Sequence, residues 1–260
     1  MSDTPSSATP SKNHYDHDPL SALDAIGEAQ RIAFAPILFQ AAVCLRDLGI
    51  LRQLEQRGDA GATRHELAEA CSLSDYGAGV LLDMGLSGRL VFQQGEKFFL
   101  AKTGHFLLND KMTRVNMDFT RDICYAGMAR LKEAVTAGTP AGLEVFGKWP
   151  TIYPALSSLP EPAKTSWFAF DHFYSDCAFG PALAHIFQYK PALIYDVGGN
   201  TGRWALRCVG HDPDVRVTVL DLPQQVVLLK KETATAPNGE RIDGIGLDIL
   251  GEGDLPGEAD

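Results

Sequence analysis

The stretch ALIYDVGGNTGRWAL, residues 192–206, constrains the fold more than any other part of the sequence. A short apolar run ends in Asp196, and three glycines and one asparagine stand in the next six positions. The run predicts a buried parallel strand, and Arg203–Val209 predicts the start of a helix. A strand, a glycine turn and a helix N-terminus together present unpaired N–H groups and a positive dipole end to a ligand. An ordinary strand-to-helix loop would explain the same glycines. The choice between a ligand-binding loop and an ordinary connection therefore depends on the rest of the sequence.

Two further strands are predicted downstream, at about Val215–Leu220 and Ile242–Leu247, with a helix between them. Strands that alternate with helices predict a parallel, doubly wound α/β sheet. Asp196, Asp221 and Asp248 each stand at the carboxyl end of a predicted strand, where open α/β sheets bind ligands. A carboxylate after the second strand can accept hydrogen bonds from a ribose diol, and one after the third can reach an adenine amino group. The three acids therefore predict a nucleoside site.

The spacing of the glycines narrows the choice of nucleoside. A G-x-G-x-x-G dinucleotide fingerprint that starts at Gly198 would need glycines at Asn200 and Arg203, and no P-loop lysine follows. The pattern that remains is acid-x-Gly-x-(Gly/Asn)-x-Gly, which Asp196, Gly198, Asn200 and Gly202 satisfy. Asparagine is a good substitute for glycine at a positive φ. Such a loop suits a nucleoside that lacks a pyrophosphate and carries a zwitterionic tail.

The N-terminal part of the chain predicts a helical module. Pro19–Gln56 has apolar residues on more than one helical face, which a second subunit or the rest of the same chain must cover; we favour a homodimer. Thr63 and Glu66 form a capping box that opens a helix. A second helix follows near Asp75–Leu86, and then a hairpin closed around Gly95. Helix, turn, helix and hairpin is the pattern of a winged-helix domain.

The charges of this module argue against nucleic-acid binding. The whole chain has a formal net charge of -10, and residues 63–104 hold four basic and five acidic residues. Residues 74–88, in the position of a recognition helix, include no Lys, Arg, Asn or Gln that could reach a base edge. We therefore expect the module to serve packing and dimerisation and not to bind DNA.

Residues 111–137 predict one amphipathic helix, and a segment rich in glycine and proline connects it to a region dense in aromatic residues. The aromatic residues could line a pocket for a flat ligand or simply pack in a core, and both interpretations stay open. His172 is the only imidazole among them and is a candidate acid or base. The aromatic residues are Trp167, Phe168, Phe170, Phe173, Tyr174 and Phe179.

Composition excludes several other classes of protein. The five cysteines are scattered and form no C-x-x-C pair, so neither a disulfide framework nor a metal site is expected. The sequence contains no run of eighteen apolar residues, so no membrane span is predicted. Residues 1–18 are polar and rich in Pro and Ser, which predicts a disordered tail instead of a signal peptide. The expected compartment is the cytoplasm.

The segments YDVGGNTG, VTVLDLPQQV and RIDGIGLDIL resemble the successive motifs of class I S-adenosylmethionine-dependent O-methyltransferases. In this family an N-terminal winged-helix domain dimerises and a C-terminal Rossmann-like domain binds the cofactor; plant phenolic, bacterial small-molecule and bacteriochlorophyll-ring methyltransferases belong to it. The resemblance covers the chain after about residue 20. It implies a tail (1–18), a winged-helix dimerisation domain (19–108), a helical connector with substrate-lining helices (109–190) and the N-terminal half of a Rossmann-like domain (191–260).

The resemblance also implies roles for individual residues. S-adenosyl-L-methionine is the implied cofactor, and a hydroxyl group on a small aromatic or polycyclic molecule is the implied methyl acceptor, although the fold also serves reactions at carbon or nitrogen. The implied cofactor loop is Asp196, Gly198, Gly199, Asn200 and Gly202; Asp221 and Leu222 would hold the ribose, Asp248 and Ile249 the adenine, and Ser175 the methionine end, while Trp167, Asp171 and Tyr174 would face the acceptor.

One departure from the family concerns the C-terminal end. The family sheet has seven strands, whereas this sequence stops at LPGEAD, after its third predicted strand. The histidine that relatives use as general base would lie beyond that point, so no catalytic residue is assigned. We therefore expect a Rossmann-like domain truncated after its third strand. Two hypotheses remain: a methyltransferase, and a catalytically inactive dimerisation or regulatory protein derived from the family.

Overall fold

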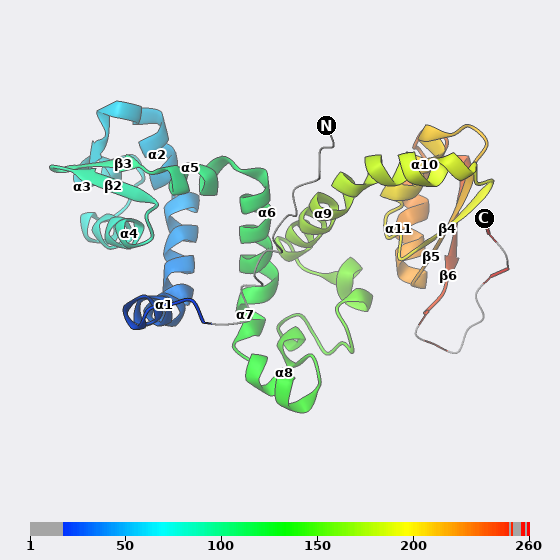
Figure 1. The fold of residues 1–260 in the computed structure, drawn as a ribbon, viewed down its shortest axis with the longest axis horizontal. Helices are drawn as coiled ribbons and strands as arrows, with labels where there is room; N and C mark the ends of the chain where they lie inside the picture. The colour runs from blue at the N-terminus through cyan, green and yellow to red at the C-terminus, as the bar shows by residue number, and fades with distance from the viewer. Residues whose placement is uncertain (1–17, 250, 252–255, 258) are drawn as a thin grey trace, which may run out of the picture. The chain divides into compact units, whose positions relative to one another are not determined.

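The computed structural model describes residues 18–249, 251, 256–257 and 259–260. The tail predicted for residues 1–18 therefore lies outside the described residues, apart from Asp18. The chain forms two compact units, Met1–Asp110 and Lys111–Asp260. Each is described by itself below, and Figure 1 labels their helices and strands.

The first unit is mainly helical and carries one small sheet. Its strands, β1 (Ala62–Thr63), β2 (Val91–Gln94) and β3 (Lys97–Leu100), form an antiparallel sheet in the order β1-β3-β2. The β2–β3 turn contains Gly95 at φ +60°, and Thr63 and Glu66 form the capping box of α3, so the predicted hairpin and capping box are confirmed. The helices are α1 (Ala22–Asp47), α2 (Ile50–Arg57), α3 (Arg64–Ala70), α4 (Asp75–Ser87) and α5 (Lys102–Asn109), with a 3₁₀ turn at Gly58–Ala60.

The long helix α1 changes direction along its length, as Figure 1 shows. Pro36 stands inside the helix, where the proline ring removes a backbone donor and bends the axis. Gly49, at φ +89°, separates α1 from α2. The core of this unit is aliphatic, with fully buried leucines from α1, α2, α3 and α4: Leu45, Leu51, Leu54, Leu67 and Leu82.

The second unit begins with a run of short helical segments, which corrects the single helix predicted for residues 111–137. The segment divides into α6 (Lys111–Phe119), a π-helical turn (Thr120–Cys124), α7 (Tyr125–Met128) and α8 (Leu131–Ala137). At the π turn, the Thr120 hydroxyl donates to the Asn116 carbonyl (2.8 Å). Near the second break, Gly127 lies so close to Gly142 that a Cβ added to Gly127 would be 2.9 Å from the Gly142 carbonyl oxygen. A tertiary contact between two backbones thus overrides the helical period.

The aromatic-rich region forms one long helix, α9 (Ala163–Ile186). Before it come two 3₁₀ segments, Ala141–Val145 and Tyr153–Ser158, and after it a 3₁₀ turn at Phe187–Tyr189. The aromatic rings of α9 pack against α6: the ring of Phe119 stacks on that of Phe170 with centroids 4.1 Å apart.

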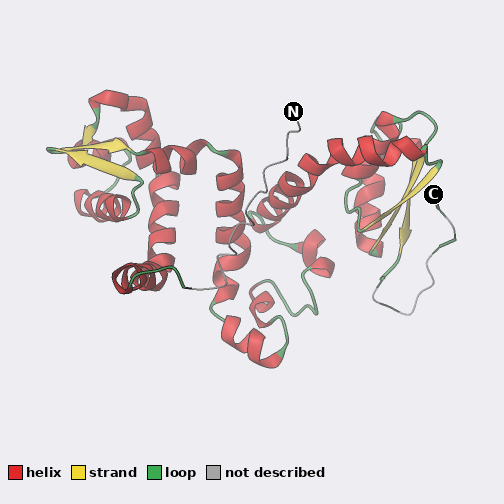
Figure 2. Cartoon of the chain, viewed as in Figure 1, coloured by secondary structure: helices red, strands yellow, loops and turns green. Residues whose placement is uncertain are grey.

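The rest of the second unit is a parallel α/β layer (Figure 2). The elements follow in the order β4 (Leu193–Val197), α10 (Arg203–His211), β5 (Arg216–Asp221), α11 (Pro223–Thr233) and β6 (Ile242–Gly246), with a 3₁₀ turn at Gly239–Arg241 before β6. The strands pair in parallel in the order β4-β5-β6, which confirms the predicted alternation of strands and helices. Apolar residues of α10, of β5 with the residue before it, and of α11 form its core: Ala205, Cys208, Val209, Val215, Val217, Val219 and Leu229.

Candidate functional site

The loop between β4 and α10 has the sharp turn that its glycines predict. Gly198 (φ +74°), Asn200 (φ +52°) and Gly202 (φ +81°) all adopt left-handed backbone conformations. The Gly198 N–H donates to the Leu220 carbonyl (2.8 Å), and the Gly202 N–H donates to the Gly199 carbonyl (2.9 Å). The loop is therefore tied both to β5 and to itself, with asparagine at a position where it tolerates positive φ.

Two of the glycines are also required by close packing. A Cβ added to Gly199 would lie 2.3 Å from Asp196 Oδ2 and 2.9 Å from Val219 Cγ1. A Cβ added to Gly202 would lie 2.4 Å from Leu229 Cδ1. The loop therefore fits closely over the strand ends, and only glycine leaves this geometry undisturbed.

Asp221, at the carboxyl end of β5, fixes the loop from the neighbouring strand. Its Oδ2 accepts a hydrogen bond from the Asn200 N–H (2.8 Å), and its Oδ1 accepts one from the Leu222 N–H (2.7 Å). Backbone donors to a carboxylate make strong, oriented hydrogen bonds. The residue predicted to hold a ribose thus also holds the glycine loop in place.

A cavity of about 230 Å³ lies between this loop and helix α9. It brings together six of the residues to which the family resemblance assigns a role, namely Asp171, Ser175, Asp196, Gly198, Gly199 and Asn200. Helix α9 contributes one wall, and the glycine loop with the first turn of α10 contributes the other. The remaining lining residues are His172, Phe179, Thr201, Arg203 and Trp204.

Three buried polar atoms of the cavity lining have no hydrogen-bond partner within the described part of the chain: Asp196 Oδ2, Asn200 Oδ1 and His172 Nε2. Buried polar atoms in folded proteins are nearly always paired, so three of them in one lining indicate where a ligand supplies the partners. Burial, together with the nearby charge of Asp221, raises the pKa of Asp196 to about 6. A positively charged group beside this aspartate would stabilise its ionised carboxylate, which burial and Asp221 disfavour.

The charges around the cavity are mainly negative. Arg203, the one lysine or arginine in the lining, donates from Nε to Asp176 Oδ1 (3.0 Å) and from Nη2 to Asp176 Oδ2. Asn200 Nδ2 donates to Asp171 Oδ2 over 3.4 Å. Because Arg203 is paired with Asp176, the carboxylates of Asp171 and Asp196 are not balanced within the lining. The cavity therefore suits a cationic ligand.

Several predicted residues do not line this cavity. Asp221 and Leu222 lie at the end of β5 and Gly202 ends the glycine loop, and none of the three lines the cavity. Asp248 and Ile249 are exposed in the segment after β6. The Tyr174 hydroxyl donates to Asn116 Oδ1 (2.8 Å). The ring centroids of Trp167 and Phe119 are 5.7 Å apart. These two aromatic residues of α9 thus take part in packing against α6.

The lining residues on α9 follow a simple pattern. His172, Ser175 and Phe179 are spaced by three and four residues, so they share one helical face. The sequence named all three, Ser175 for the methionine end, His172 as a candidate acid or base and Phe179 among the aromatic residues that could line a pocket, but it assigned no role to the other lining residues, Thr201, Arg203 and Trp204. Arg203 and Trp204 follow the last glycine of the loop directly, and the ring of Trp204 lies 5.3 Å from that of Phe179.

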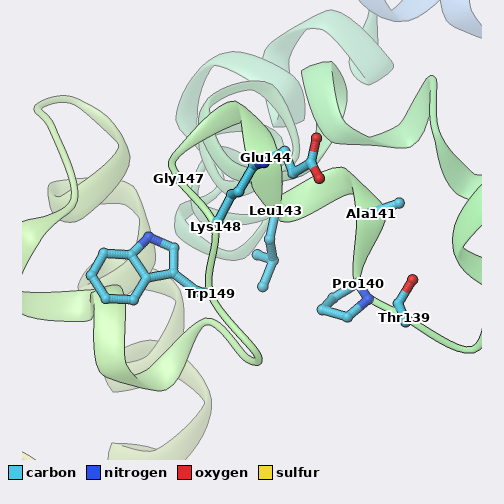
Figure 3. Close-up of a pocket in the computed structure, with 8 residues that line it drawn as sticks. All are labelled: Thr139, Pro140, Ala141, Leu143, Glu144, Gly147, Lys148 and Trp149. Carbon is cyan, nitrogen blue, oxygen red and sulfur yellow. The ribbon is translucent and has the colours of Figure 1, made fainter.

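A second cavity, of about 320 Å³, is lined by residues between Thr139 and Trp149 and shares no lining residue with the first (Figure 3). Figure 3 shows the Trp149 indole pointing away from Pro140 and Thr139, with Leu143 between them. The Glu144 carboxylate on its rim accepts a hydrogen bond from Arg130. Because its single carboxylate is already paired, this cavity offers less chemistry than the one at the glycine loop.

The described residues contain no group of three or more His, Cys, Asp or Glu residues that could hold a metal ion. In the same part of the chain, no single helix has the length and apolar composition to span a membrane; only Ala22–Asp47 and Ile50–Ala60 taken together, with a bend of 57° between them, have both.

Comparison with known proteins places the chain among methyltransferase folds. Residues 27–98 match the model of the Dimerisation2-like domain, and a search of curated proteins gave no match. The chain is similar to the S-adenosylmethionine-dependent methyltransferase SibL in its apo form (24% identity, 90% of this chain and 69% of that chain, TM-score 0.65). It is also similar to the mitomycin 7-O-methyltransferase MmcR (18%, 92% and 69%, TM-score 0.69).

A third similar structure is human N-acetylserotonin methyltransferase in complex with S-adenosylmethionine (20% identity, 94% of this chain and 70% of that chain, TM-score 0.60). At these identities the likeness shows the fold. The chain therefore combines a match to the Dimerisation2-like domain with a fold like that of these S-adenosylmethionine-dependent methyltransferases, in agreement with the resemblance of its sequence motifs.

Proposed function

We propose that the protein is an S-adenosylmethionine-dependent methyltransferase that methylates a hydroxyl oxygen of a small aromatic or polycyclic acceptor. The observation that carries this proposal is the cavity at the glycine loop, where buried Asp196 Oδ2 and Asn200 Oδ1 are unpaired acceptors. S-adenosylmethionine carries a sulfonium and an ammonium group, which match unpaired acceptors and unbalanced carboxylates. A dinucleotide would bring a pyrophosphate into the same negative surroundings, which is unfavourable.

In this proposal each part of the site has one task. Asp196, Gly198, Gly199, Asn200 and Gly202 form the cofactor loop, Asp221 and Leu222 hold the ribose, and Ser175 lies at the methionine end. Asp248 and Ile249 flank the adenine, and Trp167, Asp171 and Tyr174 face the acceptor. When the acceptor oxygen is already ionised, holding it in line with the methyl group is sufficient for transfer, because positioning alone lowers the barrier strongly.

Replacing Asp221 by Asn tests the proposal. The amide keeps the size of the carboxylate but loses its charge, so we expect the affinity for S-adenosylmethionine to fall at least about tenfold, the effect of weakening one or two charge-assisted hydrogen bonds. Asp243→Asn is the matched control, because this carboxylate stands on neighbouring β6 and is exposed. Isothermal titration calorimetry measures both. Equal, measurable affinity of Asp221→Asn and the unchanged chain would remove Asp221 from the ribose site, and no binding by the unchanged chain would favour the alternative, a catalytically inactive dimerisation or regulatory protein.

We further propose that the first unit is a winged-helix domain through which two copies of the chain associate. Four large apolar residues of α1 are exposed, although such side chains are normally buried: Leu23 (78% exposed), Ile26 (61%), Phe34 (57%) and Ile37 (57%). The 3.6-residue helical period places Leu23, Ile26 and Phe34 on one side of the part of α1 before Pro36, and Ile37 follows this proline directly. An exposed apolar stripe of this kind is a typical oligomer contact, and the match to a Dimerisation2-like domain supports the same conclusion.

A charge placed in this stripe is expected to separate the dimer. Phe34→Glu would bury a carboxylate in the proposed interface, so we expect a shift from dimer to monomer in light scattering coupled to size-exclusion chromatography. Ile32→Glu is the control: Ile32 is also exposed (67%), but the helical period places it on the opposite side of α1. An unchanged dimer with Phe34→Glu, or an equal loss with Ile32→Glu, would contradict this assignment of the interface.

A further inference from the structure

His172 lines the cavity at the glycine loop, but the proposed function gives it no task. It stands on α9 one turn after Phe168, whose ring lies 5.8 Å from the imidazole. Its Nε2 atom is buried and has no hydrogen-bond partner among the described residues. Leaving a buried nitrogen without a partner is unfavourable, so the ligand is expected to supply one.

The charged groups around His172 favour a cationic ligand group and disfavour an anionic one, so a carboxylate of the ligand needs a hydrogen-bond donor there. Its electrostatic neighbours are Asp171 and Asp176, which favour the protonated ring, and Arg203, which opposes it. Burial, the largest cause, and then Arg203 lower the pKa of His172 below its usual value, so the ring is neutral at pH 7 and carries one N–H. An ammonium group finds unpaired acceptors at Asp196 and Asn200. A carboxylate, in contrast, enters surroundings dominated by carboxylates.

Two of the polar side chains in the lining already use donors within the protein. Arg203 already uses Nε and Nη2 for Asp176, and Asn200 uses its backbone N–H for Asp221 and its side-chain amide for Asp171. Among the lining side chains, the imidazole of His172 is a buried nitrogen that is not yet committed.

We propose that His172 is a positioning residue that donates its Nε2–H to the α-carboxylate at the amino-acid end of the cofactor. This inference rests on the proposed function, because it takes S-adenosylmethionine as the ligand. The ammonium and the carboxylate of the zwitterion are then separated across the cavity, the first toward Asp196 and Asn200 and the second toward α9. His172 thereby makes the site specific for a nucleoside that carries a complete amino acid.

Two ligands that differ only in the carboxylate test this assignment. The first is S-adenosylhomocysteine, and the second is its decarboxylated analogue, which keeps the amine and the adenosine. Calorimetry with the unchanged chain, His172→Phe and His172→Gln gives the affinities. His172→Phe keeps a planar ring without a donor, whereas His172→Gln keeps an N–H donor. Thermal unfolding of each variant checks that the fold is retained.

We expect His172→Phe to bind S-adenosylhomocysteine about 10-fold to 100-fold more weakly, the effect of one hydrogen bond to a charged group. The decarboxylated analogue should bind this variant and the unchanged chain within about a factor of two, and His172→Gln should recover part of the lost affinity. Equal losses for both ligands, or no loss for either, would overturn the role of His172 and leave the proposed function intact. If the unchanged chain bound neither ligand, the proposed function would fail, and this inference with it.

Discussion

Replacing Gly199 by Ala is expected to abolish detectable binding of S-adenosylmethionine, with a loss of affinity of about 100-fold or more. The new Cβ would lie 2.3 Å from Asp196 Oδ2, 2.6 Å from Asp196 Cγ and 2.9 Å from Val219 Cγ1. Either the loop or the Asp196 carboxylate must move, and overpacking of this kind typically destabilises a protein by about 1–3 kcal/mol. Both the loop and the carboxylate belong to the proposed cofactor site, so the displacement acts directly on binding. Calorimetric titration measures the effect.

Gly210→Ala is the control for this variant. Gly210 lies in α10, and a Cβ added there meets no atom within 4 Å. Alanine in a helix is more favourable than glycine by about 0.5–1 kcal/mol, so this variant should be slightly more stable and should bind the cofactor as the unchanged chain does. If Gly199→Ala bound S-adenosylmethionine as tightly as Gly210→Ala, the loop would have no part in the site.

Replacing Asp196 by Asn is expected to stabilise the unliganded protein at pH 7 and to weaken cofactor binding at the same time. Burial and the charge of Asp221 raise the pKa of Asp196 from 3.8 to about 6, so at pH 7 the folded chain holds an ionised carboxylate in unfavourable surroundings. A shift of this size corresponds to about 2–3 kcal/mol. The amide removes this charge, and it also removes the partner that we propose for the cationic end of the cofactor.

The pH dependence of the Asp196 effect follows from the direction of the shift. Because the folded pKa lies above the unfolded one, the contribution of Asp196 to stability is fully present below about pH 3.8 and is lost as the pH rises through about 6. Chemical denaturation at several pH values should therefore give Asp196→Asn a stability advantage that grows between pH 4 and 7. The affinity of the unchanged chain for S-adenosylmethionine should rise over the same range. A difference in stability between the two proteins that does not change with pH would contradict this account.

Local patterns predicted the parts of the fold that local interactions determine. The capping box at Thr63, the turn at Gly95 and the left-handed Asn200 each follow from the chemistry of one or two residues, and each is present. The three strands of the second unit were also predicted to within about two residues, because short apolar runs end at Asp196 and Asp221 in register with their neighbours.

Contacts between residues distant in the sequence account for what the patterns missed. The break in residues 111–137 depends in part on the approach of Gly127 to Gly142, which no helical period reports. Phe119 stacks on Phe170, 51 positions further along the chain, so the sequence alone did not decide between pocket and core for the aromatic residues of α9. Similarly, the sequence offered His172 as a candidate acid or base, and the proposed contact with the cofactor followed only when the structure showed its unpaired Nε2 in the lining of the cavity at the glycine loop.

The most direct test of the central claim is a crystal structure of the chain soaked with S-adenosylhomocysteine. We expect density for the nucleoside in the cavity lined by Asp171, Ser175 and Gly199, with its amino-acid end beside His172 and its ribose toward Asp221. An empty cavity at saturating ligand, or a phosphate-containing nucleotide bound there in preference, would contradict the claim that this loop cradles a sulfonium nucleoside.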